Sequence, residues 1–173
     1  LANIKISDTV TTMDNHAFQN CTSLSSIFIP KGITSLGDAT FESCTSLQNV
    51  TIPENVKTIG TNLFYNCTGL KEVIIENGVA EIGNWIFDGC TALEKITLPY
   101  AGQSESSVAS NSENPLANSL FWYSSTENTY SVNGWGVPYT LKSITITGGA
   151  CIPSNAFYGL SSLEEIKIYG TAS

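Results

Sequence analysis

The sequence lacks the features that mark several common functional classes. It contains no run of 18 or more apolar residues, the length that a membrane-spanning helix requires, and no basic segment followed by an apolar one, as in a signal peptide. Positive charge is scarce, because 7 lysine and arginine residues stand against 15 acidic residues, for a net charge of −8. Phosphate backbones and anionic lipids repel such a protein, so nucleic-acid binding, membrane binding and membrane insertion of this segment are disfavoured.

Motifs for catalysis and metal binding are also missing. His16 is the only histidine, and no G-x-S-x-G turn accompanies it, so a serine–histidine–aspartate triad has no basis. The sequence has no C-x-x-C pair, no glycine-rich phosphate loop after a strand and no calcium loop. Paired acids such as Glu72 and Glu94 leave glycoside hydrolysis as a formal alternative. We expect a protein without enzyme activity, catalytic residues, cofactor or metal.

What the sequence does contain is a repeat of 23 residues. A phenylalanine opens each unit, a cysteine follows three residues later and a leucine six residues later. The columns are Phe18, Phe41, Phe64 and Phe87; Cys21, Cys44, Cys67 and Cys90; Leu24, Leu47, Leu70 and Leu93; Ile27, Val50, Val73 and Ile96; and Ile29, Ile52, Ile75 and Leu98. Repetition at such a period is typical of a solenoid, in which each unit buries its apolar side chains against its neighbours.

Each unit predicts one strand and a turn. The L-x-x-I-x-I segment alternates like a half-buried strand, its β-branched residues favour that conformation, and prolines such as Pro53 end it. The F-x-x-C segment is too short for a long helix, so we expect a helical or 3₁₀ turn there. Trp135 stands where a later unit expects its phenylalanine. Seven parallel strands are predicted, at residues 1–6, 24–29, 47–52, 70–75, 93–98, 141–146 and 163–168.

The L-x-x-I-x-I-P strands, the I-G turns and F-x-x-C segments such as Phe41-Glu42-Ser43-Cys44 resemble the BspA-type (Treponema pallidum-type) leucine-rich repeats over nearly the whole chain. The resemblance implies an α/β leucine-rich-repeat solenoid, right-handed and horseshoe-like, with a parallel β-sheet and short helical or 3₁₀ turns on the opposite face. It also implies a bacterial surface or secreted protein that takes part in adhesion to host or partner proteins. We expect one domain over residues 1–173.

An irregular insertion at about residues 100–134 interrupts the repeat. Residues 101–114 are rich in serine and asparagine and predict a loop. Leu116, Leu120 and Phe121 are spaced for one face of a short helix. Six aromatic residues then fall within nineteen positions: Phe121, Trp122, Tyr123, Tyr130, Trp135 and Tyr139. They either cover the core where the repeat is broken or line a surface for a ligand.

The cysteine column favours a ladder of buried, reduced thiols that pack as small apolar side chains. Leu160 occupies the same column in a later unit, which supports this interpretation. A disulfide between neighbouring turns and a metal site are the alternatives. Cys151 lies outside the column and is interpreted as core filling or as a semi-exposed thiol.

The strand pattern also predicts which side chains face outward on the concave side of the sheet, where solenoids commonly bind partners. Most are polar, but Phe28 and Ile74 are not; they are either tolerated surface residues or a contact patch. The predicted partner-binding residues, on the concave face and in the insertion, are Ser26, Phe28, Asn49, Thr51, Glu72, Ile74, Lys95, Thr97, Trp122, Tyr123 and Tyr130.

These observations lead to a functional hypothesis. We expect a non-enzymatic interaction module, extracellular or on the cell surface, that binds a protein or glycan partner. A structural spacer within a larger surface protein is the alternative. Because Leu1 falls within a repeat and the chain ends soon after Ile168, without polar capping segments, we also expect a fragment of a longer protein or ends covered by another chain, including end-to-end self-association.

Overall fold

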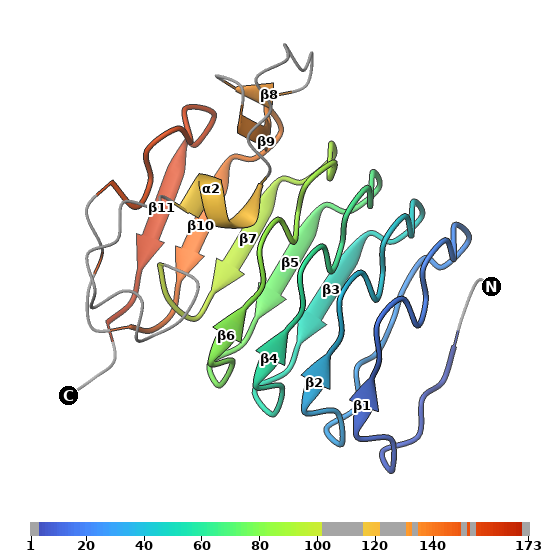
Figure 1. Ribbon diagram of the computed structural model, residues 1–173. Coiled ribbons are helices and arrows are strands. Elements are labelled where there is room, and N and C mark those ends of the chain that lie inside the picture. Colours follow the sequence, from blue (N-terminus) through green and yellow to red (C-terminus); the bar gives the residue numbers. More distant parts are fainter. Residues whose placement is uncertain are drawn as a thin grey trace.

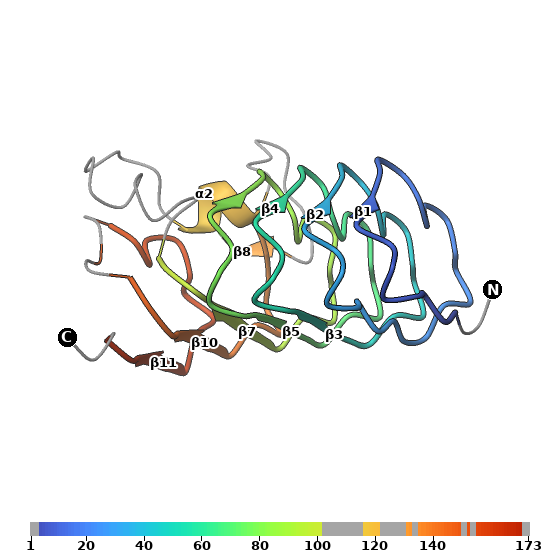
Figure 2. The same cartoon turned by 90° about the horizontal axis from the view of Figure 1, so that it is seen from below.

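The computed structural model describes residues 4–101, 116–121, 131–132, 135–149, 152 and 155–170. The chain winds into successive coils that lie side by side along one axis (Figure 1). The coils contribute four-residue strands to a main sheet and two-residue strands to a second sheet opposite it (Figure 2). All strand pairs within these two sheets are parallel.

The strands follow the repeat. The main sheet has the order β11-β10-β7-β5-β3, formed by Glu165–Ile168, Ser143–Ile146, Lys95–Leu98, Glu72–Ile75 and Asn49–Ile52. The second sheet has the order β1-β2-β4-β6, formed by Thr12–Met13, Ser35–Leu36, Thr58–Ile59 and Glu81–Ile82. The remaining elements are helix α2, Leu116–Leu120, and the antiparallel pair β8, Ser131–Val132, with β9, Trp135–Pro138.

Alternation within each strand places the core between the two sheets. In β3, Val50 and Ile52 are buried whereas Asn49 and Thr51 are exposed, as the period of two predicts. The phenylalanine column forms a continuous stack, with ring centroids 5.6 Å apart from Phe18 to Phe41 and from Phe41 to Phe64, and 6.0 Å apart from Phe64 to Phe87. Burial of these apolar columns is the main source of stability.

Two of the seven predicted strands are wrong in the part of the chain that the structure describes. Residues 4–6 and 24–29 are not strands, so the main sheet begins at β3. Their apolar columns nevertheless face inward, since Ile29 is buried and Ile4, Ile6 and Ile27 pack against the core. The physical reason for the error is that the L-x-x-I-x-I pattern reports side-chain burial, which these segments achieve without a backbone ladder.

The prediction of helical or 3₁₀ turns opposite the main sheet is also wrong. The regular F-x-x-C segments are irregular turns, bounded by two residues with positive φ four positions apart, such as Asn62 (φ 59°) and Asn66 (φ 58°). Their N–H groups point along the solenoid axis, where those of Asn62, Phe64 and Asn66 donate to Asn84, Ile86 and Asp88 of the next coil at 2.8–3.0 Å. A right-handed helix excludes residues with positive φ, and it requires the backbone N–H groups to donate within the helix rather than to the next coil.

The insertion returns to the core through α2. Leu116, Leu120 and Phe121 are buried, which confirms the predicted apolar helix face. Trp85 and Phe87 donate their N–H groups to the carbonyls of Ser119 and Leu120 at 2.7 and 3.0 Å, as they would to a regular coil. The Phe121 ring lies 6.2 Å from Phe87 and extends the aromatic stack. The position after Phe87 in the phenylalanine column, which the spacing assigned to Trp135, is therefore filled by Phe121, and Trp135 is the first residue of β9.

Candidate binding surface on the main sheet

The outward face of the main sheet is built from two columns of side chains. Strand register places Asn49, Glu72, Lys95, Ser143 and Glu165 in one column, and Thr51, Ile74, Thr97, Thr145 and Lys167 in the other. This register is the one that the repeat predicts. Ser26 and Phe28 are exposed and precede these columns, but they lie outside the hydrogen-bonded ladder. The outward register of the columns agrees with the strand pattern, whereas their role in binding stays a prediction.

Phe28 and Ile74 do not form one apolar patch. The Phe28 side chain is 72% exposed, whereas Ile74 is only partly exposed. The polar residue Thr51 holds the position between them in the column, and each of the two apolar side chains lines a different cleft. Because an apolar side chain gains free energy in proportion to the surface that a partner removes from water, Phe28 is the stronger candidate for contact with a partner.

The first cleft lies beside β3, at the N-terminal end of the main sheet, and encloses about 460 Å³. Ile27, Phe28 and Ile29 line one side, and Asn49, Thr51 and Pro53 line the other. Lys31, Glu54, Asn55 and Glu76 complete its lining. A cleft of this size, with one apolar wall and a largely polar remainder, has the ordinary dimensions of a ligand site.

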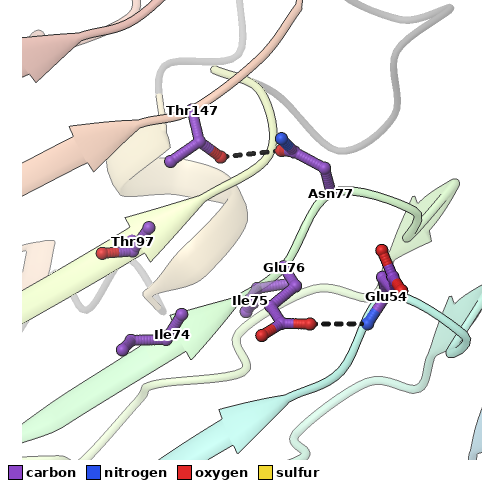
Figure 3. Close-up of a pocket in the computed structure, with 7 residues that line it drawn as sticks. All are labelled: Glu54, Ile74, Ile75, Glu76, Asn77, Thr97 and Thr147. Atoms are coloured by element: carbon purple, nitrogen blue, oxygen red, sulfur yellow. Dashed lines mark hydrogen bonds between the residues drawn. The ribbon is translucent and has the colours of Figure 1, made fainter.

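The second cleft encloses about 470 Å³ at the carboxyl ends of β5 and β7 (Figure 3). Glu76 Oε2 accepts a hydrogen bond from the Glu54 N–H at 3.0 Å, and the Thr147 hydroxyl donates to Asn77 Oδ1 at 2.7 Å. Glu54 and Glu76 line both clefts, so the two hollows share one acidic border. Sequence reasoning missed this border, although acidic residues within two positions of the ends of successive strands, at Glu54 and Glu76, were a usable signal.

Charge is distributed unevenly over this face. At the C-terminal end, Lys167 lies 2.9 Å from Glu165, and this hydrogen-bonded pair lowers the pKa of Glu165 and raises the pKa of Lys167. Both side chains are about half exposed to solvent, at 48% for Lys167 and 51% for Glu165, so the pair adds little to stability. Within the described part of the chain, neither the Glu54 nor the Glu76 carboxylate forms a salt bridge. The acidic border therefore offers two carboxylates without a salt bridge to a cation, beside the Lys57 ammonium, which donates to the backbone carbonyls of Glu54 and Gly78 at 3.2 Å.

The aromatic residues of the insertion divide into two groups. Phe121 is fully buried on Phe87, which supports the interpretation that it covers the core. Tyr139 is 56% exposed. The predicted contact residues Trp122, Tyr123 and Tyr130 lie outside the described residues, so their part in binding stays a prediction.

The cysteine column is a ladder of free thiols. Cys44, Cys67 and Cys90 are buried and Cys21 is partly buried, and none of the four is in a disulfide. The thiols of Cys44, Cys67 and Cys90 donate to the carbonyls of the phenylalanines one coil earlier, at 3.0–3.2 Å. Burial, with a smaller effect of the neighbouring thiol, raises the pKa of Cys44 to about 11 and those of Cys67 and Cys90 further. The ladder is structural, as predicted; Cys151 lies outside the described residues.

Across the ranges that the structure describes, no three His, Cys, Asp or Glu side chains gather in a group that could hold a metal ion. In the same ranges, no helix has the length and apolar character to cross a membrane.

Comparison with known proteins agrees with this architecture. Residues 1–114 match the model of the BspA type leucine rich repeat region in six copies, so the chain belongs to this family. The leucine-rich-repeat protein TpLRR of Treponema pallidum is 35% identical, with a TM-score of 0.54, over 56% of this chain and 45% of that one. No curated protein matches the chain.

Two more distant structures share the fold. A leucine-rich-repeat protein from Bacteroides ovatus has 19% identity and a TM-score of 0.56, over 98% of this chain and 45% of its own. The pneumococcal vaccine antigen PcpA has 19% identity and a TM-score of 0.54, over 93% of this chain and 40% of its own. The chain thus spans less than half the length of each of these structural relatives.

Proposed function

We propose that the chain is a non-enzymatic interaction module of a bacterial surface or secreted protein, and that it binds a protein partner through the outward face of its main sheet. The observation that carries this proposal is the exposed double column on a closely hydrogen-bonded sheet, which fixes side chains from distant parts of the sequence in one plane. Membership of the BspA-type family and the likeness to a pneumococcal vaccine antigen support an extracellular location and a role in adhesion.

A rigid surface of this kind suits binding because little conformational entropy is lost when a partner docks. The exposed Phe28 ring offers an apolar contact beside polar neighbours, the combination that interfaces use at their centre and rim. The surface would be uniform if the module served only as a spacer, whereas Phe28 and the two clefts make it locally distinct.

The proposal is tested by capture of partners on an array of extracellular-matrix proteins and glycans, with the purified chain as probe. Thr97→Arg places a bulky charge in the middle of the outward face, whereas Thr58→Arg places the same change on the exposed face of the second sheet. We expect Thr97→Arg to reduce binding to a captured protein at least tenfold and Thr58→Arg to leave it unchanged. Equal effects of the two substitutions, or an array without any captured protein, would contradict the proposal, and the second result would favour the spacer.

A further inference from the structure

The edge of β3 that faces away from β5 carries backbone groups without partners. Glu72 N–H donates to Gln48 C=O at 3.3 Å, and Glu76 N–H donates to Ile52 C=O at 2.9 Å, so the even-numbered residues of this segment face β5. Because successive residues of a strand direct their backbone groups to opposite sides, the N–H and C=O groups of Asn49 and Thr51 face the other edge. Within the described residues, none of these four groups has a hydrogen-bond partner.

The coil that precedes β3 would supply the missing partners, but it is separated from β3 on the side of the main sheet. On the side of the second sheet the two coils remain in contact. Between these coils, β1 pairs with β2, and Phe18 N–H donates to Thr40 C=O at 2.8 Å. On the sheet side, residues 26–29 form no ladder with β3, and the first cleft, of about 460 Å³, lies between them. The gap between residues 26–29 and β3 is therefore a wedge, closed toward the second sheet and open at the outward face of the main sheet. The free edge of β3 forms one of its walls.

The chemistry of the wedge defines its occupant. The free donors and acceptors of Asn49 and Thr51 match an extended peptide, which carries the same groups at the same spacing. Phe28 forms an apolar wall opposite them. Glu54 and Glu76 stand at the end of the cleft toward which β3 runs, and Lys31 is the cation that lines it. The two carboxylates outnumber Lys31, which precedes Glu54 by one repeat and stands at the same end of the cleft. Neither carboxylate forms a salt bridge among the described residues, and the Lys57 ammonium donates instead to the backbone carbonyls of Glu54 and Gly78 at 3.2 Å. Both carboxylates are therefore available to a basic residue of a ligand.

We propose that the wedge between Phe28 and β3 binds an extended peptide segment of a partner protein by strand addition to β3. The peptide runs parallel to β3, like the neighbouring strands, and exchanges hydrogen bonds with Asn49 and Thr51. Its apolar side chain covers Phe28, and a basic residue at its carboxyl end reaches Glu54 and Glu76. This inference rests on the proposed function, because it specifies the chemistry of the protein partner.

The free edge is tested first by amide hydrogen exchange of the 173-residue chain, followed by NMR. The amides of Asn49 and Thr51 are expected to exchange at least a hundredfold faster than those of Val50 and Ile52, which point to β5. A Thr51 amide as protected as that of Val50 would show that the edge is already closed, and would overturn the proposal.

Binding is tested with a capped heptapeptide of alternating threonine and valine that ends in two lysines. We expect saturable binding in the micromolar range and new protection of the Thr51 amide. The same peptide with N-methyl groups on the residues that face β3, and a peptide with glutamates in place of the lysines, should each bind at least tenfold more weakly. Failure of the lysine peptide to bind, or equal binding of either altered peptide, would refute strand addition.

Protein variants locate the site. Glu54→Gln together with Glu76→Gln keeps the hydrogen-bond acceptor for Glu54 N–H but removes both charges, and it should weaken the lysine peptide about tenfold. Glu81→Gln, on the second sheet, is the matched control and should have no effect. Phe28→Ala should weaken the peptide severalfold, whereas Tyr158→Ala, at the other end of the solenoid and similarly exposed, should not.

A glycan or a second copy of the chain, as alternative occupants of the wedge, would give different binding results. Binding of a β-1,4-linked glucose hexasaccharide that depends on Phe28, or dimerisation in sedimentation equilibrium that Phe28→Ala abolishes, would overturn the assignment of a peptide. Failure of this inference is distinguishable from failure of the proposed function. If the array captures a protein whose binding depends on Thr97, but the wedge binds no peptide, only this inference fails. If the wedge binds the peptide but the array captures no protein, only the proposed function fails.

Discussion

The stack of phenylalanine rings permits a quantitative prediction at Phe64. Its side chain is fully buried, and its ring is stacked between Phe41 at 5.6 Å and Phe87 at 6.0 Å. Truncation of a buried phenylalanine to alanine costs about 3–5 kcal/mol, through lost transfer free energy and the cavity left behind. Each aromatic contact contributes about 0.5–1.5 kcal/mol beyond area burial, and Phe64→Ala removes two of them. We therefore expect a loss in the upper part of that range, about 4–5 kcal/mol.

The assay is urea unfolding followed by far-ultraviolet circular dichroism and tryptophan fluorescence. For a chain of this size, the expected loss lowers Tm by about 10–15 °C, and the urea midpoint should fall without a change in slope. Phe28→Ala removes the same atoms from a side chain that is 72% exposed, so its cost should stay within about 0.5 kcal/mol. A cost below about 1 kcal/mol for Phe64→Ala, or equal costs for the two variants, would refute the stack as a source of stability.

Three further predictions concern the coils themselves. Burial raises the pKa of the Cys44 thiol from 9.0 to about 11, so the unfolded chain loses this proton at lower pH, and the stability that the protonated thiol contributes should be present below pH 9 and fall toward pH 11. Urea midpoints between pH 8 and pH 11 should decline less in Cys44→Ala, and an identical decline would exclude the thiol as a cause. Gly60→Ala places a Cβ 2.5 Å from backbone atoms of the preceding coil and should cost about 1–3 kcal/mol, whereas Gly170→Ala, with nothing within 4 Å, should be neutral in the same assay. Ser43 has a φ of 58° in the column where Gly89 has 74°, so Ser43→Gly should raise the unfolding free energy by up to about 1 kcal/mol, and a decrease would contradict strain at this position.

Much of the fold could be predicted from the sequence, because the repeat reports directly which side chains share a level. The columns that contain Val50 and Ile52 are buried, and the outward columns of Asn49 and Thr51 have the predicted register across the main sheet. The free cysteines follow for the same reason, since a thiol between apolar neighbours behaves as a small apolar side chain. The repeat period and the burial pattern depend on the order of apolar and polar side chains, which can be read directly from the sequence.

The backbone was harder to predict. The turns opposite the main sheet require positive φ at matched positions, but these positions are filled by residues as different as His16, Ala39, Asn62 and Trp85. Asparagine alone would have suggested this conformation; the others tolerate it because hydrogen bonds between coils hold it in place. The open edge of β3 was missed for a related reason. Ile27 and Ile29 keep their apolar spacing, and nothing in that spacing indicates whether Asn49 and Thr51 find backbone partners.

The insertion shows how a solenoid can survive a break in its repeat. The frame of 23 residues assigned the phenylalanine position to Trp135, yet the structure fills it with Phe121, which no count of residues from Phe87 would select. What the coil must supply is local: carbonyls for Trp85 and Phe87, and a ring to cover the Phe87 side chain. Helix α2 provides both carbonyls, from Ser119 and Leu120, and the residue that follows the helix, Phe121, provides the ring. The requirement is thus set by the exposed end of the preceding coil rather than by the length of chain between Phe87 and Phe121.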